Sequence, residues 1–243
     1  MINNPRNISI VLTGTIVPNV KINSLYNDPN KRKEEYLKCI KYYTQFSTVY
    51  FLENSVYPLE QDIDFQTISN LIIRKFPPSS NPERGKGFQE FKMLDDWVIN
   101  ETDDVEHFIK ITGRYFYPNF ADIWQECQQK TKPKIIISQH LMVEARVELF
   151  FTNRSFYKDN FLNLYLYCDE RTGINVDTMD VWVYRKLKSL PKDFFEGFYS
   201  DTKRIGFAGT SGKPLNNHRL DNINYFIKRI NYVFDKRYIW LSF

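Results

Sequence analysis

The chain has 243 residues, with 33 Lys and Arg against 29 Asp and Glu, so its formal net charge is +4. A chain of this length buries about 70% of its unfolded surface and needs no disulfide or metal to fold. The 42% hydrophobic content excludes a disordered chain. Three widely spaced cysteines exclude a disulfide framework and a CxxC-type zinc site, and they favour a reducing compartment. Since no apolar run is long enough to span a bilayer and the start lacks a signal-peptide core, we expect a cytoplasmic protein.

Positive charge is concentrated near the end of the sequence. Residues 202–243 carry eight basic and two acidic side chains (+6), which leaves 25 − 27 = −2 for the rest. This distribution argues against nucleic acid as a partner, because a duplex-binding fold carries a basic face across it. Residues 218–238 have apolar positions at helical spacing, with basic residues elsewhere. We expect this helix to pack on the domain; peripheral contact with an anionic membrane is the other interpretation.

Short apolar and β-branched runs alternate with segments of helical periodicity. The expected strands are 8–12, 48–52, 71–76, 107–112, 135–138 and 147–152, and the expected helices are 30–46, 88–99 and 119–130. This alternation predicts an α/β fold, with a mostly parallel, Rossmann-like sheet flanked by helices. We expect one domain over residues 1–215 and a basic amphipathic helix within 216–243. The stretches 77–86 and 206–217 have the composition of functional loops.

Polar residues and glycines follow three of the expected strands. In parallel sheets ligands bind at the carboxyl ends of the strands, so these residues should converge on one edge. They are Thr13, Gly14, Glu53, Asn54, Gly113 and Arg114. The chain has neither a GxGxxG nor a GxxxxGK[ST] motif, which argues against a dinucleotide fingerprint and a P-loop NTPase.

Two basic segments are candidates for binding an anion. Lys86 and Gly87 stand at an expected helix start, where backbone N–H groups and an ammonium suit a phosphate; a solvated turn is the alternative. Lys110 stands between apolar neighbours within a strand. It either lies in water on an edge strand or provides positive charge near an anionic ligand together with Arg114.

Several carboxylates occur between residues 168 and 180, on a stretch that we expect to be a loop. One of them would serve as a general base, although carboxylates on loops are mostly solvated. The three histidines have no metal-ligand spacing and no GxSxG motif occurs, so hydrolase chemistry has little support.

Four segments in this order resemble a group of bacterial and viral glycosyltransferases that build capsule, lipopolysaccharide or O-antigen glycans on GT-A-like folds. They are ISIVLTGT, YFLENS, GKGFQEFKMLDDW and FIKITGRYF, and the resemblance covers roughly residues 8–215. It implies transfer of a sugar, of hexosyltransferase type, from a nucleotide-sugar donor to a glycan or lipid-linked acceptor. A UDP-sugar is the first choice of donor.

The resemblance also implies roles for individual residues. Thr13 and Gly14 would line the nucleotide pocket, and Glu53 and Asn54 would lie near the base or ribose. The segment around Lys86 and Gly87 would lie near the diphosphate or the donor sugar.

The chain departs from the GT-A pattern where such enzymes carry an Asp-x-Asp metal motif. Here the sequence reads Thr112-Gly113-Arg114, which puts the usual Mg²⁺ or Mn²⁺ in doubt. We expect Arg114, with Lys110 or Lys86, to compensate the charge of the leaving group in place of a metal. If the reaction inverts the anomeric centre, Asp177 is the first candidate for the base and Glu170 the second.

The missing acid motif also supports a different class of protein. A glycosyltransferase-like module that binds nucleotides or glycans without catalysis would not need it. A phosphoryl-transfer enzyme is disfavoured, because the chain lacks both a P-loop and an acid pair.

Overall fold

The computed structural model describes residues 6–19, 27–140, 144–172, 176–207 and 215. These residues form one seven-stranded sheet in the order β3-β2-β1-β4-β6-β5-β7. The strands are β1 (Ile8–Gly14), β2 (Val49–Glu53), β3 (Leu71–Lys75), β4 (His107–Thr112), β5 (Ile135–His140), β6 (Glu144–Asn153) and β7 (Phe195–Glu196). Only β6 runs against its neighbours β4 and β5; the paired strands otherwise run parallel. The predicted mostly parallel sheet is therefore confirmed.

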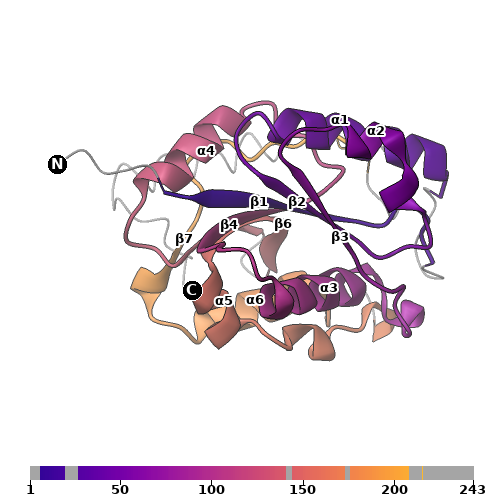
Figure 1. Ribbon diagram of the computed structural model, residues 1–243. Coiled ribbons are helices and arrows are strands. Elements are labelled where there is room, and N and C mark those ends of the chain that lie inside the picture. The colour runs from indigo at the N-terminus through magenta and orange to yellow at the C-terminus, as the bar shows by residue number, and fades with distance from the viewer. Residues whose placement is uncertain (1–5, 20–26, 141–143, 173–175, 208–214, 216–243) are drawn as a thin grey trace.

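Helices cover both faces of this sheet (Figure 1). In the view of Figure 1, helices α1, α2 and α4 lie above the sheet and α3, α5 and α6 lie below it. Their bounds are α1 (Pro29–Tyr43), α2 (Ile63–Gln66), α3 (Lys86–Asn100), α4 (Phe120–Gln129), α5 (Arg154–Asn160) and α6 (Met179–Lys188). Because both faces are covered, β1 and β2 are buried along their whole length, which explains their apolar sequences.

The aromatic residues fill two cores, one on each side of the sheet. The upper core, under α1 and α4, includes Tyr36, Tyr43, Phe51, Phe120 and Phe151. The lower core, over α3 and α5, includes Phe91, Trp97, Phe108, Phe150 and Tyr157. Neighbouring rings in both cores lie 4.7 to 6.4 Å apart between centroids, within the range of favourable ring contacts.

The register brings strand ends together as the sequence predicts. Thr13 pairs with Thr112 across β1 and β4, and Gly14 pairs with Glu53 across β1 and β2. The sequence did not predict β7 or helices α2, α5 and α6. The expected helix at 218–238 and most of the 206–217 loop lie outside the described residues.

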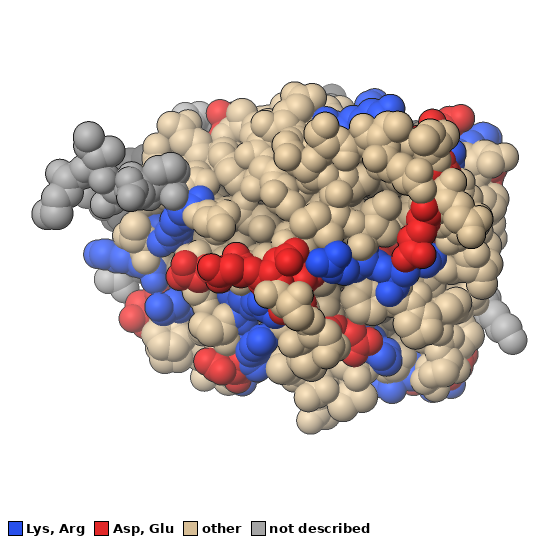
Figure 2. Space-filling view, viewed as in Figure 1, with Lys and Arg blue, Asp and Glu red and all other residues tan. Residues whose placement is uncertain are grey.

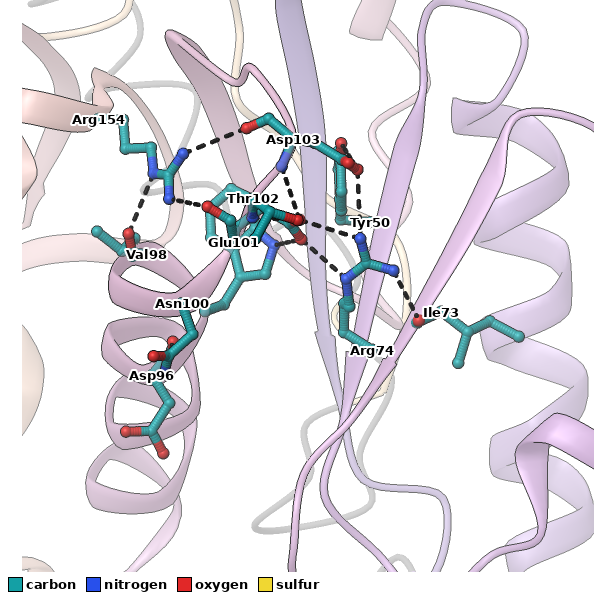
Figure 3. A network of polar contacts seen from close by, with 11 residues as sticks. Tyr50, Ile73, Arg74, Asp96, Val98, Asn100, Glu101, Thr102, Asp103 and Arg154 are labelled. Carbon is teal, nitrogen blue, oxygen red and sulfur yellow. Dashed lines mark hydrogen bonds and ion pairs between the residues drawn. The ribbon is translucent and has the colours of Figure 1, made fainter.

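A network of ion pairs and hydrogen bonds fixes the C-terminal end of α3 (Figure 3). The carboxylate of Glu101 accepts hydrogen bonds from Arg74 Nε at 2.8 Å and from Trp97 Nε1 at 2.9 Å. Burial alone would raise the pKa of Glu101, but the hydrogen bonds from Arg74 and the backbone outweigh it, so the pKa lies below its usual value. Arg154 donates to the Val98 carbonyl at 3.1 Å, as suits a cation at a helix C-terminus. These contacts hold α3 so that its N-terminus faces the carboxyl edge of the sheet.

Charged side chains of both signs gather along a band between the two helical layers (Figure 2). Above this band, the face shown in Figure 2 is mostly uncharged. Within the described residues, no helix combines the length and the apolar character needed to cross a membrane.

Candidate functional site

Glu90 of α3 connects the carboxyl ends of the two central strands. Its Oε1 atom accepts hydrogen bonds from Thr112 Oγ1 at 3.0 Å and from Thr13 Oγ1, and it lies 2.7 Å from Lys110 Nζ. The Glu90 side chain is 21% exposed, so part of its carboxylate reaches the sheet edge. Thr13, predicted to line a nucleotide pocket, thus lies at this edge with its hydroxyl already bonded.

Lys110 is fully buried, so the alternative of an edge strand with Lys110 in water is wrong. Strand β4 lies in the middle of the sheet, between β1 and β6. Besides its ion pair with Glu90, Lys110 Nζ donates hydrogen bonds to the Val147 carbonyl at 2.8 Å and to Thr112 Oγ1 at 3.2 Å. These partners compensate its buried charge. Lys110 therefore contacts Thr112 and Glu90, the residues at the carboxyl edge of the sheet.

Glu53 forms hydrogen bonds to the loops that follow β1 and β2. Its carboxylate accepts hydrogen bonds from the amides of Ile16 at 3.0 Å and Ser55 at 3.1 Å, and it pairs with Lys75. Glu53 has no exposed surface, so these bonds replace the water that a buried carboxylate loses. The neighbouring Asn54 is also buried and accepts a hydrogen bond from Thr15 Oγ1 at 2.6 Å. Both residues shape the loops of the site.

Gly14 and Gly113 are required by packing. A Cβ on Gly14 would lie 2.9 Å from the Tyr36 ring, and one on Gly113 would lie 2.9 Å from the Thr13 carbonyl oxygen. Such distances are shorter than van der Waals contact, so only glycine fits at these strand ends.

Three cationic side chains from three different elements gather at the same edge. Arg32 stands in the first turn of α1, Lys86 at the start of α3, and Arg114 just beyond β4. Burial lowers the pKa of Lys86 to about 8; the charge of Glu170 opposes this, and the nearby charges of Arg114 and Arg32 lower the pKa further. Each cation is therefore within electrostatic range of another.

The two arginines of this cluster are 6% exposed and are positioned by neighbouring groups. Arg114 Nη1 forms an ion pair with Glu35 Oε2 at 2.8 Å. Arg32 Nε donates to the Thr15 carbonyl at 2.9 Å, in the loop that follows β1. Fixed guanidinium groups of this kind suit multidentate binding of phosphate oxygens. We refer to Arg32, Lys86 and Arg114 as the cationic cluster.

The N-terminus of α3 is already bonded to a carboxylate of the chain itself. Glu170 Oε1 accepts a hydrogen bond from the Gly87 amide at 2.7 Å. Gly85 has φ of +100°, and a side chain there would collide with Glu170. The Gly87 amide expected for a phosphate is therefore occupied in this structure, and Glu170, the second candidate for a base, positions the helix that carries Lys86.

Acidic side chains lie on the other side of β4, along β6 and at the start of α6. Glu148 pairs with Arg204 and lies 3.2 Å from Arg146 Nη1. Burial, together with the charges of Glu148 and Glu144, raises the pKa of Asp180 to about 7. Asp177, the first candidate for a base, is 27% exposed and lies 4.0 Å from Arg185 Nη1.

The residues described here do not form a metal site. Among the residues that the structure describes, no three His, Cys, Asp or Glu side chains are grouped so that they could hold a metal ion. At the end of β4, where the GT-A pattern places an acid motif, the charged side chain is Arg114. The residues present therefore do not fit the Mg²⁺ or Mn²⁺ that such folds imply.

Comparison with known proteins assigns no sequence family: no family model matches, and neither does any curated protein. Among solved structures, the glycosyltransferase GlyE of Streptococcus pneumoniae TIGR4 matches with a TM-score of 0.50 and 10% identity over 96% of this chain. The chain spans about half the length of that protein (52%). The inositol-1-phosphate CTP transferase of T. maritima matches at 8% identity, with a TM-score of 0.48 over 93% of this chain and 97% of the other.

These likenesses concern the fold. The chain has an α/β fold with a seven-stranded, mostly parallel mixed sheet between helices, and this fold resembles that of the glycosyltransferase GlyE. The predicted fold class is confirmed.

Proposed function

We propose that this protein is a glycosyltransferase that moves a sugar from a nucleotide-sugar donor, with a UDP-sugar as the first choice, to a hydroxyl of a glycan or lipid-linked acceptor. The observation that carries the proposal is the cationic cluster at the carboxyl edge of the sheet. Parallel α/β sheets bind ligands at this edge, and three cations from separate elements favour a ligand with more than one negative charge. A nucleoside diphosphate has that charge.

In this proposal the cationic cluster supports departure of the nucleoside diphosphate. Negative charge grows on the leaving phosphate as the bond to the sugar breaks, and preorganised cations stabilise that charge. Lys86 and Arg114 would contact the diphosphate, while Glu35 and Glu170 hold them in place through the contacts described above. Because the described residues offer no metal ligand set, the proposal assigns compensation of this charge to the cations themselves.

An acceptor hydroxyl needs a base if the reaction inverts the anomeric centre. Two carboxylates near the start of α6 are candidates, Asp177 and Asp180. A group with a pKa near neutrality is the more effective base, and the raised pKa of Asp180, about 7, favours it over Asp177. The sequence did not single out Asp180, because its pKa depends on Glu148 and Glu144, which are distant in sequence.

The resemblance of the strand-end segments to enzymes of capsule, lipopolysaccharide and O-antigen synthesis favours a sugar as the transferred group. We therefore propose surface polysaccharide or glycoprotein glycan synthesis as the process. The cationic cluster would bind a nucleoside triphosphate equally well. The decisive assay must therefore separate glycosyl transfer from nucleotidyl transfer.

A donor screen provides that assay. The protein is incubated with UDP-, GDP-, CMP- and dTDP-sugars, and separately with CTP and a sugar phosphate, each with EDTA or with Mn²⁺. We expect release of UDP, GDP or dTDP from at least one of the corresponding sugar donors in EDTA, and a lower rate with Arg114→Gln. Pyrophosphate release from CTP alone would contradict glycosyl transfer, and binding without turnover of any donor would favour the non-catalytic class. Activity that EDTA abolishes and Mn²⁺ restores would contradict the role given to the cationic cluster.

A further inference from the structure

We propose that Tyr167, which packs against Trp182, binds a sugar ring of the acceptor next to the nucleotide site. The inference rests on the proposed function and adds to it a binding site for the second substrate. Tyr167 ends the short 3-10 turn Leu164–Tyr167, and Trp182 belongs to α6.

The geometry of this pair is preformed. The ring centroids of Tyr167 and Trp182 are 4.9 Å apart with an interplanar angle of 32°. The guanidinium of Arg185 lies over the Trp182 ring, 4.6 Å from its centroid. Trp182 is thus held by two neighbours, whereas Tyr167 remains 59% exposed. An exposed aromatic ring that is held in place offers a contact surface whose ordering costs little conformational entropy.

This aromatic surface adjoins the groups already placed at the site. Tyr167 immediately precedes Cys168, whose carbonyl accepts a hydrogen bond from Arg84 Nε at 3.1 Å, just before the start of α3. Two residues further on, Glu170 bonds to Gly87 at the N-terminus of α3. On its other side, Arg185 lies 4.0 Å from Asp177. Contacts therefore connect the segment of Tyr167 to the start of α3, which carries Lys86, and to Asp177 just before α6.

The surroundings fit a carbohydrate. One face of a pyranose presents C–H bonds with partial positive charge, which complement the negative face of an aromatic ring. The hydroxyls at the ring edge need polar partners, and Asp169, Asp177 and Arg185 supply both acceptors and donors near Tyr167. Leu166 and Val176 are also exposed. Each of the two carboxylates is paired with an arginine, Asp169 with Arg171 and Asp177 with Arg185, so these pairs leave no excess of positive charge to attract an anionic membrane.

Saturation-transfer difference NMR with a panel of methyl glycosides tests this inference. The panel holds methyl glucoside, galactoside, mannoside and N-acetylglucosaminide, each titrated against the full chain saturated with UDP. We expect at least one glycoside to bind, with a Kd about fivefold higher for Tyr167→Ala and unchanged for Tyr167→Phe, which keeps the ring. Ile99→Ala, which truncates a side chain that is 52% exposed near the C-terminal end of α3 and away from Lys86, is the matched control and should bind as the wild type does.

The outcomes separate this inference from the proposed function. If UDP binds but no glycoside does, or if Tyr167→Ala binds glycosides as the wild type does, the inference is overturned and the nucleotide site stands. If the wild type binds no nucleotide, the proposed function fails. Loss of sedimentation with anionic vesicles in Tyr167→Ala, without loss of glycoside binding, would assign this surface to a membrane and overturn the inference.

Discussion

Raising the pH from 7 to 9 should weaken the binding of a nucleoside diphosphate, because Lys86 loses its charge over this range. Burial is the main reason why the pKa of Lys86 is about 8 and not 10.5; Arg114 and Arg32 lower it further against the opposing effect of Glu170. A bound diphosphate adds negative charge beside the ammonium and favours its protonated form. Binding above pH 8 therefore requires uptake of a proton, and the affinity falls as protons become scarce.

The size of this effect follows from the pKa. At pH 9, about one unit above it, roughly one-tenth of the free protein carries a protonated Lys86, so the Kd for UDP should be about tenfold higher than at pH 7. Isothermal titration at pH 7, 8 and 9, in buffers of different ionisation enthalpy, measures both the affinity and the proton uptake.

Two variants isolate the contribution of Lys86. Lys86→Arg stays charged throughout, so its Kd should change by less than about twofold over this range. Lys86→Met should bind weakly at every pH. A wild-type Kd that is constant from pH 7 to 9, or a Lys86→Arg Kd that rises as in the wild type, would refute the assignment of Lys86 to the diphosphate.

Other substitutions probe the remaining parts of the site and the fold. Arg114→Gln should weaken UDP binding about tenfold or more, measured by isothermal titration, with an unchanged circular dichroism spectrum; unchanged affinity would exclude Arg114 from the anion site. Asp180→Asn should lower kcat of transfer by about 10²–10⁴-fold, and the wild-type rate should rise as the pH passes about 7. A wild-type rate in Asp180→Asn would exclude Asp180 as the base and make Asp177 the first candidate for that role. Glu101→Gln should lower the free energy of unfolding by about 1–3 kcal/mol in urea titrations, because the buried carboxylate holds Arg74 and Trp97. Asp96→Asn, which alters an exposed pair, should lower it by less than about 0.5 kcal/mol; equal effects would contradict the role of the Glu101 network.

The sequence predicted the sheet and the meeting of its strand ends well, for a physical reason. Strands such as Ile8–Gly14 and Val49–Glu53 are covered on both faces, so their apolar composition is visible without knowledge of the fold. Their ends are marked by a change to polar residues, and parallel pairing then places Thr13 beside Thr112. The α6 helix was missed because its first turn follows a run of acidic and polar residues typical of a loop.

The partners of charged residues could not be predicted from the sequence. Arg32 lies in the segment NKRKEE, which resembles a solvated helix face, yet α1 packs so that Arg32 is buried against the loop after β1. Lys110 was identified as unusual, but its partner Glu90 lies on a helix twenty residues earlier. Such pairings depend on how α1 and α3 pack on the sheet, and periodicity carries no information about this.

A crystal structure of the protein with bound UDP tests the proposed role of the cationic cluster by direct observation. We expect the diphosphate to lie at the carboxyl edge of β1 and β4, with its oxygens within hydrogen-bonding distance of Lys86 Nζ and the Arg114 guanidinium. A diphosphate bound elsewhere, or held by a metal ion on carboxylates and away from these cations, would contradict this expectation.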